Sequence, residues 1–305
     1  MADLTVALGE KLALRNPILT ASGTFGYGDE APDLVDVNRL GGLITKSLTR
    51  YPREGHPPPR IAETPAGMLN AIGLANIGVE RFCAENLPFL AGLKTAVLVS
   101  IAGSSMDEYG EVLEILEAGD PGIAGYEINI SCPNVAAGGM EFGVSAEMTE
   151  KLTRLLRPLT QRHLMVKLSP NVTSIADIAL AAQRGGADAV SAINTVVGLG
   201  VDPRTGVFHV SGGLAGLSGP AIRPIALAAV YQVARAVTIP VVGVGGIMTV
   251  DDVVAFLRVG AHAVQVGTAN YRDPAIGLRL AAEVSVFMEE LGVERISGFW
   301  GSSLA

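Results

Sequence analysis

Short apolar runs alternate with helical patterns along the whole chain, and this alternation constrains the fold more than any other feature. Eight such runs occur, at residues 17–23, 41–47, 95–103, 125–131, 163–169, 189–195, 239–246 and 263–269. Strands that alternate with helices are typical of a parallel sheet, and eight of them close naturally into a barrel. An open doubly wound sheet is the alternative. We therefore expect an α/β protein built as a single (β/α)8 TIM barrel.

The segments between and before these units also have expected places. Residues 4–14 (LTVALGEKLAL) are predicted to form a small N-terminal hairpin. Residues 48–75 and 196–219 are too long for ordinary turns between a strand and a helix. Both segments follow predicted strands, so they should form long loops at the C-terminal mouth of the barrel, where active sites of this fold lie. No linker divides the chain, and we expect residues 1–305 to form one catalytic domain.

The composition makes several classes of partner poor candidates. The chain is 49% hydrophobic and carries a formal charge of −8 without a cluster of Lys and Arg, which argues against nucleic acid and anionic membranes. No apolar run approaches the ~18 residues of a membrane span, and the start lacks the pattern of a signal peptide. Two cysteines cannot form a four-thiolate iron–sulfur or zinc site, and the four histidines share no ligand spacing. We expect a cytoplasmic protein without a metal site.

Polar side chains on four of the predicted strands should point toward the barrel axis. Strand alternation directs Asn129 and Lys167 inward if their apolar neighbours face the helices, and Lys46 and Asn194 fall near strand ends. One or two of these could instead be surface residues on misplaced strand ends. A buried unpaired charge is costly, so Lys167 requires an anionic or strongly accepting partner. The pattern predicts a cationic, amide-rich site suited to a planar polar ligand.

Glycines at the ends of the last two predicted strands indicate a phosphate site. Gly243, Gly245 and Gly246 end the seventh strand, and Gly267 and Thr268 end the eighth. Glycines also make tight turns, but in this fold the loops after strands seven and eight form the common phosphate site. Bare backbone N–H groups can reach an anion there. The pairing favours a phosphorylated cofactor.

Cys132 stands where a thiol can be reactive. A lone cysteine is usually a small buried hydrophobe, and Cys83, inside a helical segment, fits that description. Cys132 instead follows a strand and precedes Pro133, where the backbone leaves the sheet. A thiol in that position could act as a nucleophile or as a general base.

Motifs along nearly the whole chain resemble the class 1 dihydroorotate dehydrogenases, most closely the NAD-linked class 1B catalytic subunit. They are ASGTFGYG (21–28), TKS (45–47), NAIGLAN (70–76), NISCPNV (129–135), VKLSPNVT (166–173), INT (193–195), GLSGPAIRP (216–224), GVGGI (243–247) and VGTAN (266–270). The resemblance implies FMN-dependent oxidation of (S)-dihydroorotate to orotate in de novo pyrimidine biosynthesis. It also implies that Cys132 removes the proton from C5 while the C6 hydride passes to N5 of FMN.

The resemblance assigns further residues to the substrate and to one FMN per chain. The implied substrate-binding residues are Lys46, Asn70, Ala71, Ile72, Gly73, Leu74, Asn129, Asn134, Asn194 and Thr195. The implied cofactor-binding residues are Ser22, Lys46, Ser47, Ser100, Asn129, Lys167, Ile193, Gly219, Gly245, Gly246, Gly267 and Thr268. Ser100 departs from the asparagine expected in related NAD-linked sequences, although a serine can still donate a hydrogen bond.

The resemblance further implies a homodimer that binds a second subunit carrying FAD and a [2Fe–2S] cluster. The resulting heterotetramer would pass electrons to NAD.

Three other functions are compatible with the residues alone. One is an FMN barrel acting on another reduced pyrimidine, as in dihydropyrimidine dehydrogenase. Another is a flavin-free lyase that uses Lys167 as a Schiff base. The third is a non-catalytic binding barrel, which would leave Cys132 without a role.

Overall fold

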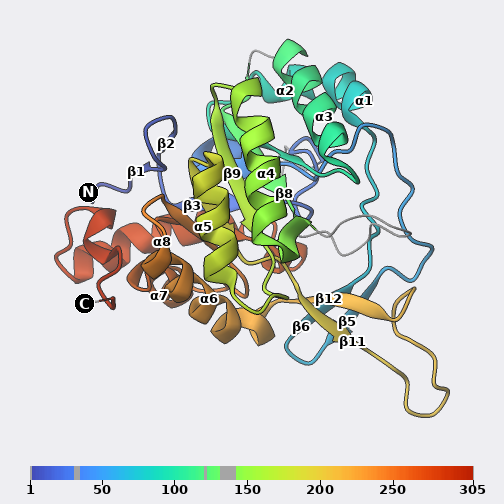
Figure 1. Cartoon of the computed structure of the whole chain (residues 1–305). Helices are drawn as coiled ribbons and strands as arrows, with labels where there is room; N and C mark the ends of the chain where they lie inside the picture. Colours follow the sequence, from blue (N-terminus) through green and yellow to red (C-terminus); the bar gives the residue numbers. More distant parts are fainter. Residues whose placement is uncertain (1, 31–34, 120–121, 131–141, 305) are drawn as a thin grey trace.

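Eight parallel strands close into a barrel at the centre of the molecule (Figure 1). The computed structural model describes residues 2–30, 35–119, 122–130 and 142–304. The barrel strands are β3 (Ile18–Thr20), β4 (Gly42–Ile44), β7 (Ala96–Ile101), β8 (Gly125–Asn129), β9 (His163–Leu168), β10 (Ala189–Ala192), β13 (Val241–Val244) and β14 (Ala263–Val266). Their order is β10-β13-β14-β3-β4-β7-β8-β9. Each strand lies within one of the eight predicted runs, and the predicted TIM barrel is confirmed.

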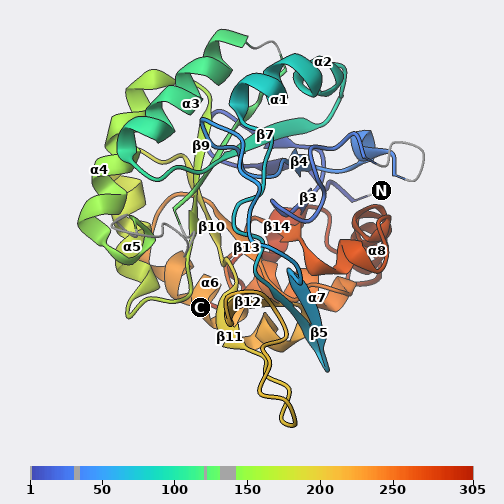
Figure 2. The ribbon, with the colours of Figure 1, turned by 90° about the vertical axis from the view of Figure 1, so that its right-hand side faces the viewer.

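Helices surround these strands, as Figure 2 shows. They are α1 (Val79–Glu85), α2 (Leu87–Leu90), α3 (Met106–Gly119), α4 (Ala146–Leu156), α5 (Ile175–Gly185), α6 (Arg223–Ala236), α7 (Val250–Arg258) and α8 (Ile276–Glu290). Short 3-10 helices are η1 (Val37–Arg39), η2 (Phe142–Val144), η3 (Arg157–Leu159), η4 (Pro220–Ile222), η5 (Thr268–Tyr271) and η6 (Ile296–Phe299). In the described ranges, no helix combines the length and the hydropathy required to cross a membrane.

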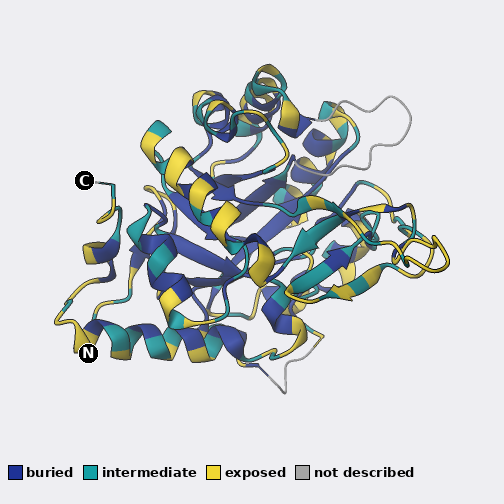
Figure 3. Ribbon diagram, turned by 90° about the horizontal axis from the view of Figure 1, so that it is seen from below, coloured by how far each residue is buried: buried dark blue, intermediate teal, exposed yellow. Residues whose placement is uncertain are grey.

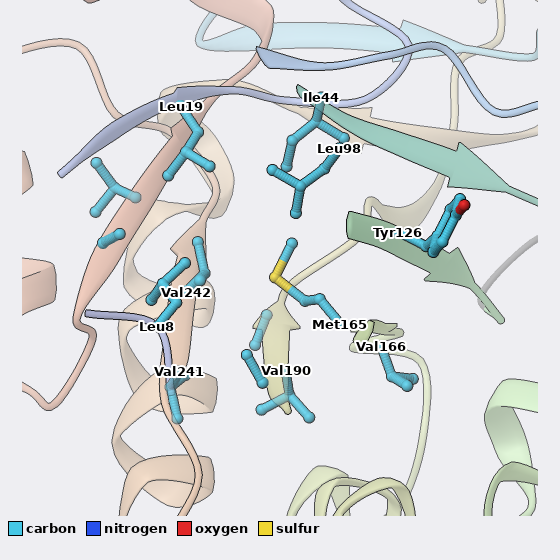
Figure 4. Close-up of a cluster of buried hydrophobic side chains, with 14 of the residues drawn as sticks. Leu8, Leu19, Ile44, Leu98, Tyr126, Met165, Val166, Val190, Val241 and Val242 are labelled. Atoms are coloured by element: carbon cyan, nitrogen blue, oxygen red, sulfur yellow. The ribbon is translucent and has the colours of Figure 1, made fainter. Parts of the chain in front are cut away.

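The core fills both the barrel and the layer between strands and helices. Parallel strands are covered on both faces and therefore read as nearly continuous apolar runs, which made them recognisable in the sequence. Figure 3 shows the strands as buried and the exposed residues on the outer faces of the helices. Inside the barrel, Met165 points toward Ile44 and Leu98, and all three are fully buried (Figure 4).

The N-terminal hairpin is confirmed and covers the end of the barrel opposite the strand C-termini. Strand β1 (Val6–Ala7) pairs antiparallel with β2 (Ala13–Leu14). Leu8, which follows β1, is fully buried, and Figure 4 shows it beside Val241 and Val242 at the start of β13. Lys11 forms an ion pair of 3.1 Å with Asp188, just before β10. The hairpin therefore contributes both apolar contacts and a charge pair to this end.

The two long connections form a small antiparallel sheet in addition to loops. The sheet has the order β11-β12-β6-β5 and contains β5 (Ile61–Thr64), β6 (Gly67–Asn70), β11 (Val196–Leu199) and β12 (Leu214–Ser218). The connection between β11 and β12 projects away from the barrel (Figure 1). Sequence analysis predicted only loops there, because these strands are short, partly exposed and rich in glycine and so lack a buried apolar run. Pairing of β6 with β12 joins the two connections into one unit.

Candidate active site

A cavity of about 470 Å³ lies where the C-terminal ends of the barrel strands meet the antiparallel sheet. Its wall includes residues that follow β3, β4, β10 and β14 and residues on β6 and β12. Barrel enzymes build their active sites at this end of the strands, and the volume is in the range of small-molecule sites. The geometry therefore identifies this cavity as the candidate active site.

Nearly all of the predicted site residues that the structure describes line this cavity. They are Ser22, Lys46, Ser47, Asn70, Ala71, Ile72, Gly73, Leu74, Asn129, Lys167, Ile193, Asn194, Thr195, Gly219, Gly245, Gly246, Gly267 and Thr268. Ser100 is fully buried and does not line it. Cys132 and Asn134 lie outside the described residues. Residues from distant parts of the chain thus converge because parallel strands place all their C-terminal ends on one side.

Serine hydroxyl groups link the β3, β4 and β7 ends beneath the cavity surface. The Oγ atom of Ser47 lies 3.3 Å from that of Ser22 and 2.8 Å from that of Ser100. The side-chain amide of Asn129 donates to Ser47 Oγ at 3.2 Å. Ser100 therefore stands behind Ser47, as seen from the cavity, and its hydroxyl helps to fix the orientation of the serine that lines it.

The asparagine side chains of the site are also held by hydrogen bonds. Asn194 Nδ2 donates to Asn129 Oδ1 at 3.4 Å, and Asn194 Oδ1 accepts from the backbone N–H of Thr195 at 2.8 Å. Asn70 Nδ2 donates to the carbonyl of Gly216 at 2.9 Å, across the β6–β12 pair. Side chains fixed in this way lose little additional freedom when a polar ligand binds. The amide-rich surface is therefore preorganised.

Lys46 lines the cavity and forms no ion pair with the residues that the structure describes. Its ammonium makes no ion pair or side-chain hydrogen bond with any of the described residues. Burial lowers the pKa of Lys46, and the nearby charge of Arg60 lowers this pKa further, whereas Glu30 acts in the opposite direction. A partly buried cation with this environment is stabilised by an anionic ligand. The cavity is therefore suited to a carboxylate or another anion at the β4 end.

Lys167 has the acidic partner that the sequence required, and that partner is Glu127. Lys167 Nζ lies 3.5 Å from Glu127 Oε1 and 3.4 Å from Gln265 Oε1. The sequence indicated that Lys167 needs an acidic partner but did not identify Glu127 as that residue. The available signal was strand alternation, because Glu127 shares the inward face of β8 with Asn129.

The glycine-rich end of the cavity fits a phosphate group. Gly219 precedes η4 and α6, and Gly267 precedes η5, so both stand at helical N-termini. Gly246 has φ +74°, and a Cβ atom added there would lie 2.8 Å from the carbonyl oxygen of Gly219. Ser218, which sequence analysis did not single out, contributes a hydroxyl group 2.8 Å from that of Thr268. Glycine backbone and two hydroxyl groups at helical N-termini form a typical anion-binding surface.

The fold and the cavity define the class of protein as an α/β-barrel enzyme with its active site at the C-terminal mouth of the strands. The sequence profile of the family described as dihydroorotate dehydrogenase matches residues 5–288. The chain belongs to the dihydroorotate dehydrogenase family. This match confirms the resemblance and the predicted enzyme class, and it favours dihydroorotate over other reduced pyrimidines and over a lyase reaction.

Curated relatives cover nearly the full length of the chain. A putative dihydroorotate dehydrogenase A (fumarate) of Solibacter usitatus is 50% identical over 95% of each chain. The catalytic subunits of dihydroorotate dehydrogenase B (NAD(+)) from Bacteroides thetaiotaomicron and Geotalea uraniireducens are 46% and 47% identical over 99% and 98% of each chain. The solved dihydroorotate dehydrogenase of Eimeria tenella, in complex with ferulenol, has a TM-score of 0.82 at 19% identity and covers 99% of this chain and 88% of its own. That structure shows the shared fold.

Proposed function

We propose that this chain is the FMN-dependent catalytic subunit of a dihydroorotate dehydrogenase that oxidises (S)-dihydroorotate to orotate in de novo pyrimidine biosynthesis. Residues 1–305 act as one catalytic domain. The observation that carries the proposal is the convergence of the predicted substrate and cofactor residues on one cavity that also contains two lysines. Family membership supports the choice of substrate.

The glycine-rich end of the cavity holds the FMN phosphate in this proposal. The backbone N–H groups of Gly219, Gly246 and Gly267 supply donors, and the space left by missing Cβ atoms allows close approach of an anion. Ser22, Ser47, Asn129 and Lys167 are available for the remainder of the cofactor. When it is bound, FMN supplies the acceptor for the hydride from C6 of the substrate. A positive charge on Lys167 favours the negative charge that the reduced ring carries.

Lys46 and the asparagine side chains bind and orient dihydroorotate. The substrate has one carboxylate and a ring of amide groups. The carboxylate suits the Lys46 ammonium, which has no counter-ion among the described residues. Asn70, Asn129 and Asn194 present amide groups that can pair with the ring. Hydrogen bonds within the protein hold these asparagine side chains in place. The fixed amide groups in turn orient the substrate relative to the cofactor.

Cys132 removes the proton from C5. It follows Asn129 by three residues on the same segment, and Asn129 ends β8 and lines the cavity. The thiolate is the basic form of cysteine, so proton removal requires that Cys132 be deprotonated before or during the reaction. Asn134, two residues further on, completes the proposed substrate-binding set.

The chain works with a partner subunit when NAD is the oxidant. Relatives named as catalytic subunits of the NAD(+) enzyme support this proposal, and the fumarate name of the Solibacter relative marks the alternative oxidant. Two cysteines cannot supply the four ligands of a [2Fe–2S] cluster, so this cluster belongs to the partner, which also carries FAD in this proposal. We infer a homodimer within a heterotetramer.

An apolar surface is available for this association. It contains the exposed side chains of Leu199, Phe208 and Leu214, on β11, β12 and their connection. The cytoplasmic location stays a prediction.

Steady-state turnover with different oxidants tests the proposed function. The purified chain should contain FMN and should reduce dyes or ferricyanide with dihydroorotate, but it should not reduce NAD without a partner. Reduction of fumarate at a rate comparable to that of the dyes would assign the chain to the fumarate-using type. A folded protein that neither contains FMN nor acquires a flavin spectrum after FMN is added would contradict the proposal itself.

A further inference from the structure

A buried polar network lies inside the barrel directly below the candidate active site. Glu127 from β8, Ser191 from β10 and Gln265 from β14 are all 0% exposed, and Lys167 from β9 is 5% exposed. Glu127 Oε2 accepts hydrogen bonds from Ser191 Oγ at 2.9 Å and from Gln265 Nε2 at 2.5 Å. Its other oxygen, Oε1, has no hydrogen bond and faces Lys167 Nζ at 3.5 Å. One carboxylate thus contacts side chains from three other strands of the barrel, β9, β10 and β14.

The network has one side toward the cavity and one side toward the core. In the pairing of β8 with β9, Asn129 stands opposite Lys167 and Glu127 stands opposite Met165. Asn129 and Lys167 line the cavity, whereas Glu127 does not. Glu127 therefore belongs to the layer below, at the level of the apolar Met165. The Gln265 amide bridges the pair, because its Nε2 donates to Glu127 while its Oε1 accepts from Lys167.

Stability alone gives little reason to keep an ion pair in this layer. Removing two charges from water is costly, and well-packed apolar side chains of similar volume often give equal or greater stability. The barrel interior near the pair is otherwise filled by residues such as Leu98 and Met165. Glu127 is buried and does not line the cavity, whereas the lysine that it contacts does, and this arrangement points to a role in controlling that lysine.

We propose that Glu127 is a positioning residue that fixes the Lys167 ammonium in the wall of the proposed FMN site, and thereby sets the affinity and the reduction potential of the cofactor. This inference rests on the proposed FMN site. Gln265 acts with Glu127, because its amide has only one orientation that satisfies both charged partners. Ser191 completes the set by satisfying the oxygen of Glu127 that does not face the lysine.

The surroundings of Lys167 determine what its charge depends on. Most polar groups in the described part of the cavity wall are neutral. Next to Lys167, β10 and β14 contribute the neutral side chains of Ser191 and Gln265. The ionisable side chains that line the cavity or contact Lys167 in the described ranges are Glu127, Lys46 and Tyr271. Loss of the carboxylate leaves burial as the main influence on Lys167, and burial disfavours the charged form of a lysine.

The experiment compares the wild-type protein with Glu127→Gln, Lys167→Met and the double variant Glu127→Gln/Lys167→Met. Glu117→Gln is the matched control, because Glu117 pairs with Arg162 at 3.2 Å on helix α3, outside the site. Three quantities are measured for each protein: the Kd of FMN, the reduction potential of bound FMN as a function of pH, and the unfolding free energy of the FMN-free protein. The last quantity separates folding defects from effects on the site.

We expect Glu127→Gln to weaken FMN binding by about tenfold or more, as loss of a buried charge partner does. The reduction potential of its bound FMN should differ from that of the wild type, because the partner that fixes the Lys167 ammonium is lost. In the Lys167→Met background, Glu127→Gln should cause no further change of potential, and Glu117→Gln should match the wild type. A Glu127→Gln/Lys167→Met protein that is as stable as the wild type without FMN, but altered in FMN potential, would separate the role in the site from a role in folding.

Two results would overturn the inference while leaving the proposed function intact. One is a Glu127→Gln protein with the wild-type FMN Kd and the wild-type dependence of potential on pH. The other is an effect of Glu127→Gln that is equally large in the Lys167→Met background, which would mean that Glu127 does not act through the lysine. A wild-type protein that fails to bind FMN would instead remove the proposed function and this inference together.

Discussion

Asn129 and Lys167 stand opposite each other in the parallel pairing of β8 with β9, and both line the candidate active site. Each side chain is held from behind by a different group. Asn129 donates to Ser47 Oγ at 3.2 Å, and Lys167 is paired with Glu127 at 3.5 Å. An amide and a cation are thus fixed side by side on rigid strands. Such preorganisation allows a site to stabilise developing charge without rearrangement.

Ser100→Ala should weaken FMN binding only a few-fold. Ser100 is buried behind Ser47, so its loss removes one hydrogen bond that orients Ser47, a change of about 0.5–1.5 kcal/mol. Ser47→Ala should have the larger effect, and the double variant should resemble Ser47→Ala because both changes affect one contact. Fluorescence titration of FMN measures all three proteins. Additive losses would show that Ser100 contacts the cofactor independently of Ser47.

Lys46→Met should weaken orotate binding by about tenfold or more, because it removes the cation proposed to pair with the carboxylate. Lys94→Met, at an exposed lysine outside the cavity, serves as the control and should bind orotate as the wild type does. Isothermal titration with orotate provides the measurement. Equal Kd values for Lys46→Met and the wild type would place the carboxylate elsewhere in the cavity.

The pH dependence of orotate binding provides a related test of Lys46. Burial lowers the pKa of Lys46 from its ordinary value of 10.5. The charged form binds the carboxylate, so affinity should decrease as rising pH removes the proton. Bound orotate raises the pKa of the lysine, so the decrease in affinity should begin near the pKa of the free protein and level off above the pKa of the complex. Affinity that stays constant through the alkaline range in the wild type would argue against a role for this ammonium.

Gly246→Ala should abolish or strongly weaken FMN binding while the barrel still folds. The residue has φ +74°, and its added Cβ atom would lie 2.8 Å from the Gly219 carbonyl oxygen in the proposed phosphate site. Gly206→Ala is a suitable control, since Gly206 also has a positive φ but has no atom within 4 Å of an added Cβ. Flavin content after purification and circular dichroism report cofactor and fold separately. Retention of FMN at the wild-type level in Gly246→Ala would contradict this assignment.

His163 should make the folded protein less stable in acid. Burial lowers the pKa of His163 to about 4, and its two ring nitrogens lack hydrogen bonds. The unfolded chain, with a histidine pKa of ~6.5, therefore takes up the proton first, so stability is full above that pH and decreases between about pH 6.5 and 4. The total loss is on the order of 3 kcal/mol. Denaturant unfolding of wild-type and His163→Leu proteins across this range measures it.

His163→Leu should have a flatter stability profile than the wild type between these pH values. His209→Leu is the surface control, because His209 is exposed, and its profile should follow the wild type. Identical slopes for His163→Leu and the wild type would show that another group causes the acid sensitivity.

Strand patterns explain how far the sequence could predict this molecule. The barrel strands were recognisable because burial on both faces demands continuous apolar residues. The cavity followed from geometry, because Lys46, Asn129 and Lys167 end strands that must meet at one mouth. The antiparallel sheet was missed because Val197, Leu199 and Leu214 are exposed on it and glycines interrupt their pattern.

Glu127 was missed for a different physical reason. Strand alternation places Glu127 on the inward face of β8 with Asn129, but it does not identify the partners of Glu127, which come from β9, β10 and β14. These partners are 40, 64 and 138 residues away along the chain, as the numbering of Lys167, Ser191 and Gln265 shows. Pairwise contacts at such separations cannot be read from local sequence patterns.

Reduction of the bound flavin by dihydroorotate, followed anaerobically in a stopped-flow spectrometer, tests the central claim most directly. The wild-type protein should lose flavin absorbance, and the rate should rise with pH as the thiol of Cys132, with an ordinary pKa of ~8.5, forms its thiolate. Cys132→Ala should retain FMN and orotate binding but react about 10²–10⁴-fold more slowly, whereas Cys83→Ala should react as the wild type does. An unchanged flavin spectrum in the wild type, or an equal rate in Cys132→Ala, would contradict the account.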